Sequence, residues 1–312
     1  MTTSVLRTAD AWYVATAGGA ARIDTAARTT AELLRKPTAI AAAAAGSDTV
    51  SVESLALISP VTAPCRVVAQ MTNFASHAED AGFSPASVPL TFFRKTSGSI
   101  SGPYDDVIRP AHVRLLDYEI EIGLVFGRSM PVGSTITEEN LADYVAGLVV
   151  TNDISARDVQ LPKTQFYEGK SYPSFTPVGP ALVLLDADEL KRFTDLRLRL
   201  SVNGEVRQDR TVADMIYLPV QALQALTRFQ RVDPGDLLLT GTPVGTALSA
   251  PPKPVQLVTG LLPPALKWRL FFQAQAKNSR YLQHGDVIEA SIATDDGAID
   301  LGTQRTPVRS TP

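Results

Sequence analysis

The chain has 312 residues, of which 45% are hydrophobic and 20% charged, a composition typical of a globular protein with a large core. It carries 29 basic and 32 acidic residues, and the resulting formal net charge of −3 argues against a nucleic-acid-binding protein or a basic membrane-binding patch. Its apolar runs are much shorter than the roughly 20 residues of a membrane-spanning helix, and its first residues lack the pattern of a secretory signal.

Cysteine and histidine are scarce, and this restricts the kinds of metal site that the chain can build. The single cysteine, Cys65, excludes a disulfide within the chain and any site made of several cysteines. This usage fits a reducing compartment, so we expect a cytoplasmic protein. A three-histidine zinc site would need all of His77, His112 and His284. Any bound metal is therefore expected to have mainly oxygen ligands.

The first 64 residues predict a small N-terminal α/β domain. Residues 12–16 have a strand pattern that ends at two glycines, and residues 21–24 predict its hairpin partner. A helix is predicted from residue 30, interrupted by Pro37. The proline-punctuated stretch 59–64 predicts the boundary of this domain.

Residues 65–312 predict a second, larger domain in which strands outnumber helices. A short helix is predicted over 73–81 with Gly82 as its stop, and a longer one over 218–229. The strand patterns do not alternate regularly with helices, which favours an α+β, mostly β fold over a doubly wound sheet. The strands are expected at 66–70, 90–93, 107–109, 118–126, 144–151, 237–240 and 287–290. The stretch 251–277 is proline-rich, then helical and aromatic, and predicts an insertion before the last strands.

The segment 117–122 places two carboxylates side by side. Apolar residues alternate along it, so Glu119 and Glu121 fall on the other face of the predicted strand. Two adjacent carboxylates repel each other unless their face is wet or a cation binds between them. A solvated strand face and a cation site are both open at this point.

A second strand ends in polar residues that could complete such a site. Asp153 follows the hydrophobic run 145–151 and could supply a third carboxylate. Three carboxylates with room for water suit Mg²⁺ or Mn²⁺, with Ca²⁺ as an alternative, and do not favour zinc. The plainer interpretation is a turn in which Asp153 and Arg157 form an ion pair four residues apart.

Two further segments could contact a small anionic ligand. The turn 241–245, Gly-Thr-Pro-Val-Gly, follows an apolar strand and exposes backbone N–H groups and the Thr242 hydroxyl, which suits a carboxylate or an oxyanion. Lys170 follows a glycine and could be an electrostatic partner of the substrate. The alternatives are an ordinary tight turn and a solvated loop lysine.

The segment 73–80 offers a general base. If it is helical, His77 and Asp80 share a face, three residues apart. A carboxylate beside an imidazole fixes its tautomer and raises its basicity, as a general base requires. The alternative is a surface histidine.

Taken together, these segments resemble the fumarylacetoacetate hydrolase family. The motifs stand in the family's order: Asn-aromatic-x-x-His at 73–77, Asp-x-Glu-x-Glu at 117–121, Asn-Asp-x-Ser-x-Arg-Asp-x-Gln at 152–160, Gly-Lys at 169–170 and Gly-Asp-x-x-x-Thr-Gly-Thr-Pro-x-Gly at 235–245. The resemblance covers residues 64–250 strongly and 283–303 more weakly.

The resemblance implies a catalytic domain built as a mixed β-sandwich roll, usually dimeric, with a site at one mouth. It implies that a divalent metal, commonly Mg²⁺, is held by Glu119, Glu121 and Asp153. It further implies that His77 activates water, and that substrate contacts come from Arg157, Gln160, Lys170 and Thr242. The chain departs from the family at Asp80, where related members often have a longer glutamate, so Asp80 or the neighbouring Glu79 would have to assist His77.

The expected function is metal-dependent hydrolysis of a carbon–carbon bond in a β-diketone or acylpyruvate through a metal-bound enolate, with Lys170 as a further catalytic residue. The alternatives are a β-keto acid decarboxylase or a keto–enol tautomerase or isomerase, acting on oxaloacetate or on a 2-hydroxy-diene-dioate. The expected partners are the small-molecule substrate and a second copy of the chain, with no nucleic acid and no membrane. Specificity is expected from residues 74–90, from Arg94 and Tyr167, and from the insertion 251–277, which would shape a larger or more apolar pocket.

Overall fold

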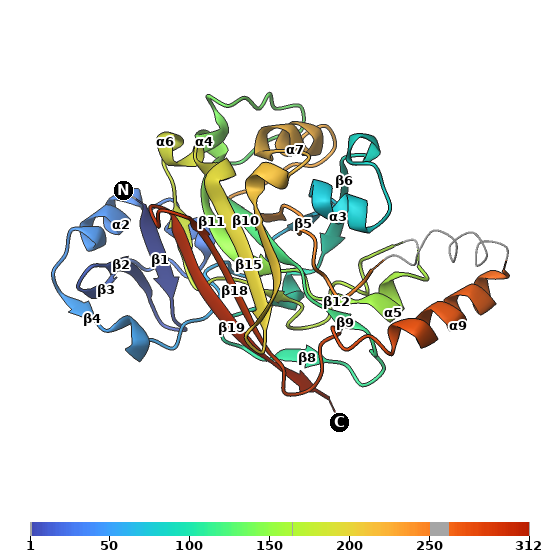
Figure 1. Cartoon of the computed structure of the whole chain (residues 1–312). Helices are drawn as coiled ribbons and strands as arrows, with labels where there is room; N and C mark the ends of the chain where they lie inside the picture. The colour runs from blue at the N-terminus through green and yellow to red at the C-terminus, as the bar shows by residue number, and fades with distance from the viewer. Residues whose placement is uncertain (1, 164, 250–261, 312) are drawn as a thin grey trace.

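A computed structural model describes residues 2–163, 165–249 and 262–311 of the chain. In this part of the chain, the architecture is a mostly β fold in which two mixed sheets pack against each other (Figure 1). Strands β10 and β11 of the larger sheet lie against β15, β18 and β19 of the smaller one. The prediction of an α+β, mostly β fold of the sandwich-roll type is confirmed.

The larger sheet has ten strands among the described residues and combines antiparallel with parallel pairs. In spatial order these strands are β4 (Thr49–Val50), β3 (Gly19–Arg22), β2 (Trp12–Thr16), β1 (Thr3–Arg7), β14 (Leu182–Leu184), β11 (Val145–Asn152), β10 (Ile120–Phe126), β17 (Leu237–Leu239), β5 (Val67–Met71) and β6 (Thr91–Lys95). All seven residues of β10 are buried, because strands flank it on both sides and the second sheet covers it.

The smaller sheet has five described strands, in the order β16 (Glu205–Thr211), β15 (Leu196–Val202), β18 (Val287–Thr294), β19 (Asp300–Ser310) and β8 (Val107–Arg109). Strand β15 alternates buried residues with half-buried or exposed ones, which shows that one of its faces packs on the core while the other faces outward. Two short pairs complete the sheets: β12 (Ser155–Ala156) with β9 (Leu116–Asp117), and β13 (Thr176–Pro177) with β7 (Ile100–Ser101).

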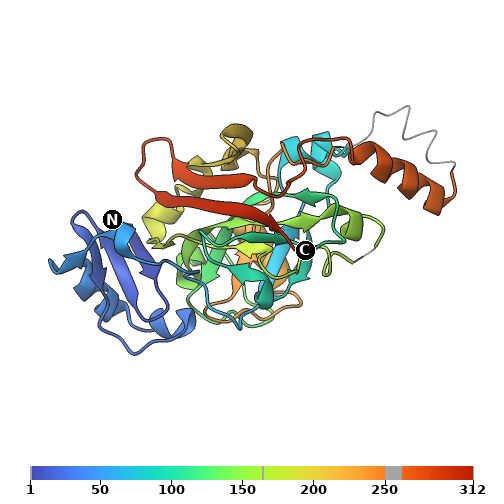
Figure 2. The ribbon, with the colours of Figure 1, turned by 90° about the horizontal axis from the view of Figure 1, so that it is seen from below.

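The helices are short and lie around the sheets. The α-helices are α1 (Thr30–Leu33), α2 (Pro37–Ala44), α3 (Ala75–Asp80), α4 (Leu141–Tyr144), α5 (Arg157–Gln160), α6 (Ala187–Leu190), α7 (Pro219–Leu226) and α9 (Pro264–Gln275). Single 3₁₀ turns are η1 (Val52–Ser54), η2 (Pro85–Ser87), η3 (Ser97–Ser99), η4 (Phe193–Asp195) and η5 (Val212–Asp214). In Figures 1 and 2, α9 projects from the body of the molecule. No described helix is long and apolar enough to cross a membrane.

The predicted helices are present, but some of their ends differ: α7 ends at Leu226 rather than near residue 229, and two other shifts have a clear physical cause. Pro37 begins α2 rather than only interrupting the preceding helix, because the first helical turn does not need its missing N–H. Helix α3 begins at Ala75 rather than at Asn73, whose side chain is used elsewhere. Gly82 follows the last residues of α3 with a φ of 85°, which agrees with its predicted role as a stop. The predicted insertion contains α9, and its residues 251–261 lie outside the described part of the chain.

The first 64 residues extend the larger sheet. Strand β1 pairs antiparallel with β14, so the four N-terminal strands continue the same sheet. One buried apolar cluster includes Trp12 and Leu33 from this region and Val125 and Leu237 from the central strands. The division of the chain at residue 64 into two domains stays a prediction.

Candidate functional site

Three carboxylates converge at one end of strands β10 and β11. Ligand oxygens of Glu119, Glu121 and Asp153 lie within 4.8 Å of one another. The three residues are 6%, 2% and 0% exposed, respectively, so the solvated strand face considered above is wrong. Burial of this much negative charge requires cations nearby.

The β10–β11 pairing places these carboxylates. Ile120 pairs with Asn152, and Glu121 pairs with the residue before it. Just beyond the ladder, the N–H of Asp153 donates to the carbonyl oxygen of Glu119 at 2.8 Å, and the side-chain oxygen of Asn152 accepts from the N–H of Glu119 at 2.9 Å. Residues 33 positions apart in the chain are thus held rigidly against each other.

Buried cations pair with two of the three carboxylates. Lys170 donates to Asp153 at 2.7 Å and also contacts Glu119. Arg157 donates to Glu119, and Lys95 donates to Asp153. The suggested Asp153–Arg157 turn pair and the solvated Lys170 are therefore both wrong, because the sheet brings stronger partners to each group.

The cations act unequally on the carboxylates. Burial alone would favour the neutral acid at Glu119, but Arg157 and Lys170 outweigh it and hold the pKa of Glu119 well below its usual range. Burial, reinforced by the nearby charges of Asp153 and Glu119, raises the pKa of Glu121 well above its usual value. Glu121 has no ion-pair partner among the described residues and accepts a hydrogen bond from the N–H of Gly241 at 2.6 Å.

This arrangement fits a divalent cation. A bound cation would compensate the charge of Glu121, which nothing else in the described structure pairs. The donors are carboxylate oxygens, which suit Mg²⁺, Mn²⁺ or Ca²⁺ better than a softer metal.

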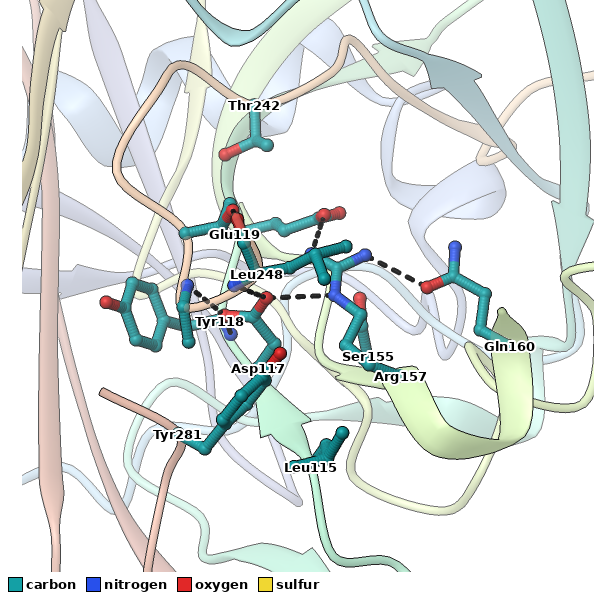
Figure 3. A network of polar contacts seen from close by, with 12 residues as sticks. Leu115, Asp117, Tyr118, Glu119, Ser155, Arg157, Gln160, Thr242, Leu248 and Tyr281 are labelled. Carbon is teal, nitrogen blue, oxygen red and sulfur yellow. Dashed lines mark hydrogen bonds and ion pairs between the residues drawn. The ribbon is translucent and has the colours of Figure 1, made fainter. Parts of the chain in front are cut away.

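Asp117 holds two parts of the site in place (Figure 3). It is not among the site residues predicted from the sequence. Its buried carboxylate accepts from Nε of Arg157 at 2.8 Å and from the N–H groups of Ala247 and Leu248 at 2.7 and 3.1 Å. Arg157 also donates to the side-chain oxygen of Gln160 at 2.9 Å. Asp117 thus fixes both the guanidinium and the segment after the Gly-Thr-Pro turn.

Hydrogen bonds from Gln208 fix the position of Thr242 in the Gly-Thr-Pro turn. The side-chain NH₂ of Gln208 donates to Oγ1 of Thr242 and to the carbonyl oxygen of Pro243, both at 2.8 Å, while its oxygen accepts from the N–H of Ile120 at 3.0 Å. Because Oγ1 of Thr242 is an acceptor here, its own proton is free to be donated to a ligand. The turn itself needs Gly241, whose φ is 89° and where a Cβ would meet that of Asn73 at 2.7 Å.

His77 and Asp80 come from α3 but do not form the expected hydrogen bond. Among the described residues, Nδ1 of His77 is buried without a hydrogen-bond partner, and Asp80 is exposed at the end of the helix. The six-residue helix leaves the shorter aspartate side chain in solvent. Burial lowers the pKa of His77 below its ordinary 6.5, although the charge of Glu119 opposes this shift. The imidazole is therefore neutral near pH 7.

A single cavity of about 1030 Å³ unites these groups. The residues predicted as metal ligands, catalytic residues or substrate contacts all line it, namely His77, Asp80, Glu119, Glu121, Asp153, Arg157, Gln160, Lys170 and Thr242. A cavity of this size corresponds to sites that bind small organic molecules.

Three polar partners in the site are not among the site residues predicted from the sequence, namely Asp117, Lys95 and Gln208. Arg94, predicted to contribute to specificity, is exposed, whereas the neighbouring Lys95 is buried and reaches Asp153. Tyr167, also predicted to contribute to specificity, is exposed and is not part of the cavity lining. The pairing of β6 with β5 decides which of Arg94 and Lys95 faces inward, so residue type gives no local signal for Lys95. No local signal indicates Gln208.

Comparison with known proteins places the chain in a group of enzymes. Oxaloacetate tautomerase Fahd2a, mitochondrial, of Rattus norvegicus is 35% identical over 204 residues, which are 65% of this chain and 63% of that protein. The chain thus matches somewhat less than two thirds of this relative's length. A probable 2-hydroxyhepta-2,4-diene-1,7-dioate isomerase from Mycobacterium abscessus is 29% identical over the full length of both chains, with a TM-score of 0.75. A fumarylacetoacetate hydrolase from Exiguobacterium antarcticum is 25% identical, also over both full lengths, with a TM-score of 0.72.

The family model described as "Fumarylacetoacetate (FAA) hydrolase C-terminal" matches residues 66–309. This span contains the three carboxylates, their cations, His77 and the Gly-Thr-Pro turn. The chain belongs to the fumarylacetoacetate hydrolase family.

Proposed function

We propose that this chain is a divalent-metal-dependent enzyme that hydrolyses a carbon–carbon bond in 2,4-dioxo acids of the acylpyruvate type. One observation carries the proposal: a neutral imidazole, at His77, shares a cavity with three converging carboxylates and their cations. The imidazole can take a proton from water. The three carboxylates and their cations form what we call the ionic end of the cavity, which can hold an anionic substrate. Mg²⁺ is the proposed metal, and Glu119, Glu121 and Asp153 are its proposed ligands.

The ionic end would bind the oxo-acid part of the substrate. Arg157 is fixed by Asp117 and Glu119, so its guanidinium is already oriented when a substrate carboxylate arrives. Gln160, held by Arg157, offers its NH₂ group, and Thr242 offers a hydroxyl proton. These donors would orient the carboxylate and the adjacent carbonyl with little loss of side-chain entropy.

His77 would then activate water. A neutral imidazole nitrogen accepts a proton from the water, whose oxygen forms a bond to the distal carbonyl carbon of the substrate. The carbon–carbon bond next to that carbonyl breaks, its electron pair passes to the oxo-acid fragment as an enolate, and a proton returned to carbon gives the second acid. Asp80, near the imidazole in the same cavity, would favour the protonated imidazole electrostatically.

Lys170 would stabilise negative charge that develops on substrate oxygen. Burial disfavours the charged form of Lys170, but the negative charges of Asp153 and Glu119 have the larger effect and raise the pKa of Lys170. Its ammonium group is therefore available as a positive charge throughout the reaction. When bound, a divalent cation would add Lewis-acid stabilisation of the same oxygens.

Tautomerisation or isomerisation of a 2-oxo acid is a second candidate. The relative from Rattus norvegicus is named an oxaloacetate tautomerase, and the neighbour from Mycobacterium abscessus is named an isomerase. Both reactions would use the same ionic end, with His77 moving a proton between carbon and oxygen instead of from water. Decarboxylation of a β-keto acid would need the ionic end but no base for water.

Isotope labelling distinguishes these candidates. Protein stripped with EDTA would be incubated in H₂¹⁸O with acylpyruvates, β-diketones or oxaloacetate, with and without Mg²⁺ or Mn²⁺. Mass spectrometry would then identify the products, and a reaction without enzyme would correct for exchange of carbonyl oxygen. Hydrolysis predicts two fragments, with ¹⁸O in the newly formed carboxylate and only when metal is added. Carbon dioxide release, or an isomer without label, would reject hydrolysis in favour of the second group of reactions.

A subunit arrangement is also part of the proposal. The family resemblance implies a homodimer, and light scattering coupled to size-exclusion chromatography would check it. A mass near twice 33.4 kDa is expected.

A further inference from the structure

The outer part of the cavity has a chemical character opposite to that of its ionic end. We infer that α9 forms a binding wall for an apolar, ring-bearing group of the substrate, so that the enzyme prefers 2-oxo acids with such a tail over short ones such as oxaloacetate. The inference deepens the proposed function, because it requires the ionic end to bind the oxo-acid part. It assigns Trp268 and Phe271 as specificity-determining residues.

One face of α9 lines the cavity. The lining residues Lys267, Leu270, Phe271 and Ala274 are spaced three, four and seven apart, so they lie on one side of the helix. Trp268 also belongs to this side. No residue of α9 is buried, which leaves this apolar surface available to a ligand.

The aromatic residues of α9 form an ordered cluster. Trp268 and Phe272 are stacked, with ring centroids 5.6 Å apart and planes 19° from parallel. Phe271 meets both rings edge-on, at 5.8 and 5.7 Å. Because each ring restricts the others, the cluster presents a preformed surface and a ligand loses little by ordering it.

Aromatic residues from other elements complete the apolar part of the cavity. Phe93 of β6 and Phe166 meet edge-on at 5.5 Å, and both line the cavity. Phe83, which follows α3, also lines it and is 61% exposed. Three separate chain segments thus turn aromatic rings toward one space, and scattered surface residues would not be expected to do so.

The size of the cavity argues against a short acid as the preferred ligand. The cavity of about 1030 Å³ is at the upper limit of ordinary ligand sites, and a four-carbon acid would fill a small part of it. Of the three lining cations among the described residues, Arg157 and Lys170 are paired with carboxylates of the ionic end, whereas Lys267 lies over the ring of Trp268, with its Nζ 5.8 Å from the ring centroid. Most of the remaining outer lining is apolar, so a ring-bearing tail would bury apolar surface there.

Two matched substrates test the preference directly. 2,4-Dioxopentanoate and 4-phenyl-2,4-dioxobutanoate share the oxo-acid end and differ in a methyl and a phenyl group. The enzyme is expected to show a kcat/KM at least about tenfold higher for the phenyl compound. Trp268→Ala and Phe271→Ala should each lower that value about tenfold and leave the methyl compound within about twofold. Arg269→Ala is the matched control, because Arg269 is exposed on α9 and does not line the cavity.

A binding measurement separates this inference from the proposed reaction. The chain has two tryptophans, and the other one, Trp12, is buried in the N-terminal region. Tryptophan emission would be titrated with 4-cyclohexyl-2-oxobutanoate and with 2-oxobutanoate, neither of which carries the 4-oxo group that water would attack. The cyclohexyl compound should change the emission at concentrations at least about tenfold lower, and Trp268→Phe should abolish that change.

The outcomes are distinguishable. Tight binding of the cyclohexyl compound without turnover of either dioxo acid would support the apolar wall and reject the proposed hydrolysis. Hydrolysis with equal kcat/KM for both dioxo acids, and no change in tryptophan emission, would reject the apolar binding wall. The proposed hydrolysis would still be supported. A Trp268→Ala variant that changes the oligomeric state but not the substrate ratio would also overturn the inference, since α9 would then serve a contact between subunits.

Discussion

The two ends of the cavity are built in different ways. At the inner end, which is the ionic end, Glu119, Asp153 and Lys170 are buried. Their positions are fixed by paired strands and by one another. At the outer end, Trp268 and Phe271 lie on α9, a projecting helix in which no residue is buried. The inner end holds charges in place for chemistry, and the outer end offers contact surface.

This difference has a physical cause. A buried charge that loses its partner costs several kcal/mol, so the inner residues depend on each other and tolerate little change. A half-buried aromatic side chain on α9 can be altered at a smaller cost in stability. If α9 forms the proposed binding wall, the chemistry depends on residues held by the sheets, and the substrate preference depends on α9.

Glu121→Gln should have the largest effect. Removing one of three converging carboxylates should abolish detectable Mn²⁺ or Mg²⁺ binding by calorimetry and lower kcat/KM about a thousandfold or more, since Lewis-acid stabilisation is worth several kcal/mol. Metal-free protein should unfold at the same temperature or higher, because the variant removes a buried carboxylate without an ion-pair partner among the described residues. Glu289→Gln, on the outer face of β18, is the control. Normal metal affinity in Glu121→Gln would exclude it as a ligand.

His77→Gln should keep the metal and lose hydrolysis. General-base catalysis contributes about 10²- to 10⁴-fold, and kcat should fall by a factor in this range. Because burial lowers the pKa of His77, the neutral base persists below pH 6.5, and activity should decline only at more acidic pH as the imidazole is protonated. The variant should lose this acidic limb of the pH–rate profile.

Glu79→Gln is the matched control for His77→Gln, since Glu79 is exposed on the same helix and does not line the cavity. It should retain both the rate and the acidic limb. An unchanged rate in His77→Gln would show that another group activates water.

Asp117→Asn should affect stability more than any change on α9. It leaves the buried Arg157 with one carboxylate partner and weakens the hydrogen bonds to Ala247 and Leu248, at a cost of about 3 kcal/mol in the free energy of unfolding. Urea denaturation of metal-free protein would measure it. Asp188→Asn, which breaks a pair in which Asp188 is 88% exposed, should leave the denaturation midpoint unchanged. Equal midpoints for both variants would mean that the inner ion pairs do not hold the site together.

Thr242→Val should have the smallest effect. It removes the hydroxyl proton offered to the substrate and leaves the NH₂ group of Gln208 with one acceptor fewer. The net value of one hydrogen bond is about 1 kcal/mol, so we expect KM to rise about fivefold to tenfold with little change in kcat. Thr242→Ser keeps the hydroxyl and should stay near the original value. A loss of kcat in Thr242→Val would instead place the hydroxyl in the transition state.

Local patterns in the sequence determined a large part of this site. Alternation along 118–126 identified the central strand and its carboxylates, because a strand has a period of two whatever surrounds it. The stop at Gly82 was equally local, since glycine readily adopts a positive φ. The aromatic helix within 251–277 was also predictable from its composition.

Only the tertiary structure decided which charges meet. Lys95 lies 58 positions from Asp153, and Gln208 lies 34 positions from Thr242, so no local pattern could join them. Exposure of Arg94 and burial of Lys95 depend on which side of β6 faces the cavity, and this follows from strand pairing rather than residue type. The interaction energy of charges depends on distance and burial, and both quantities are set when the two sheets pack.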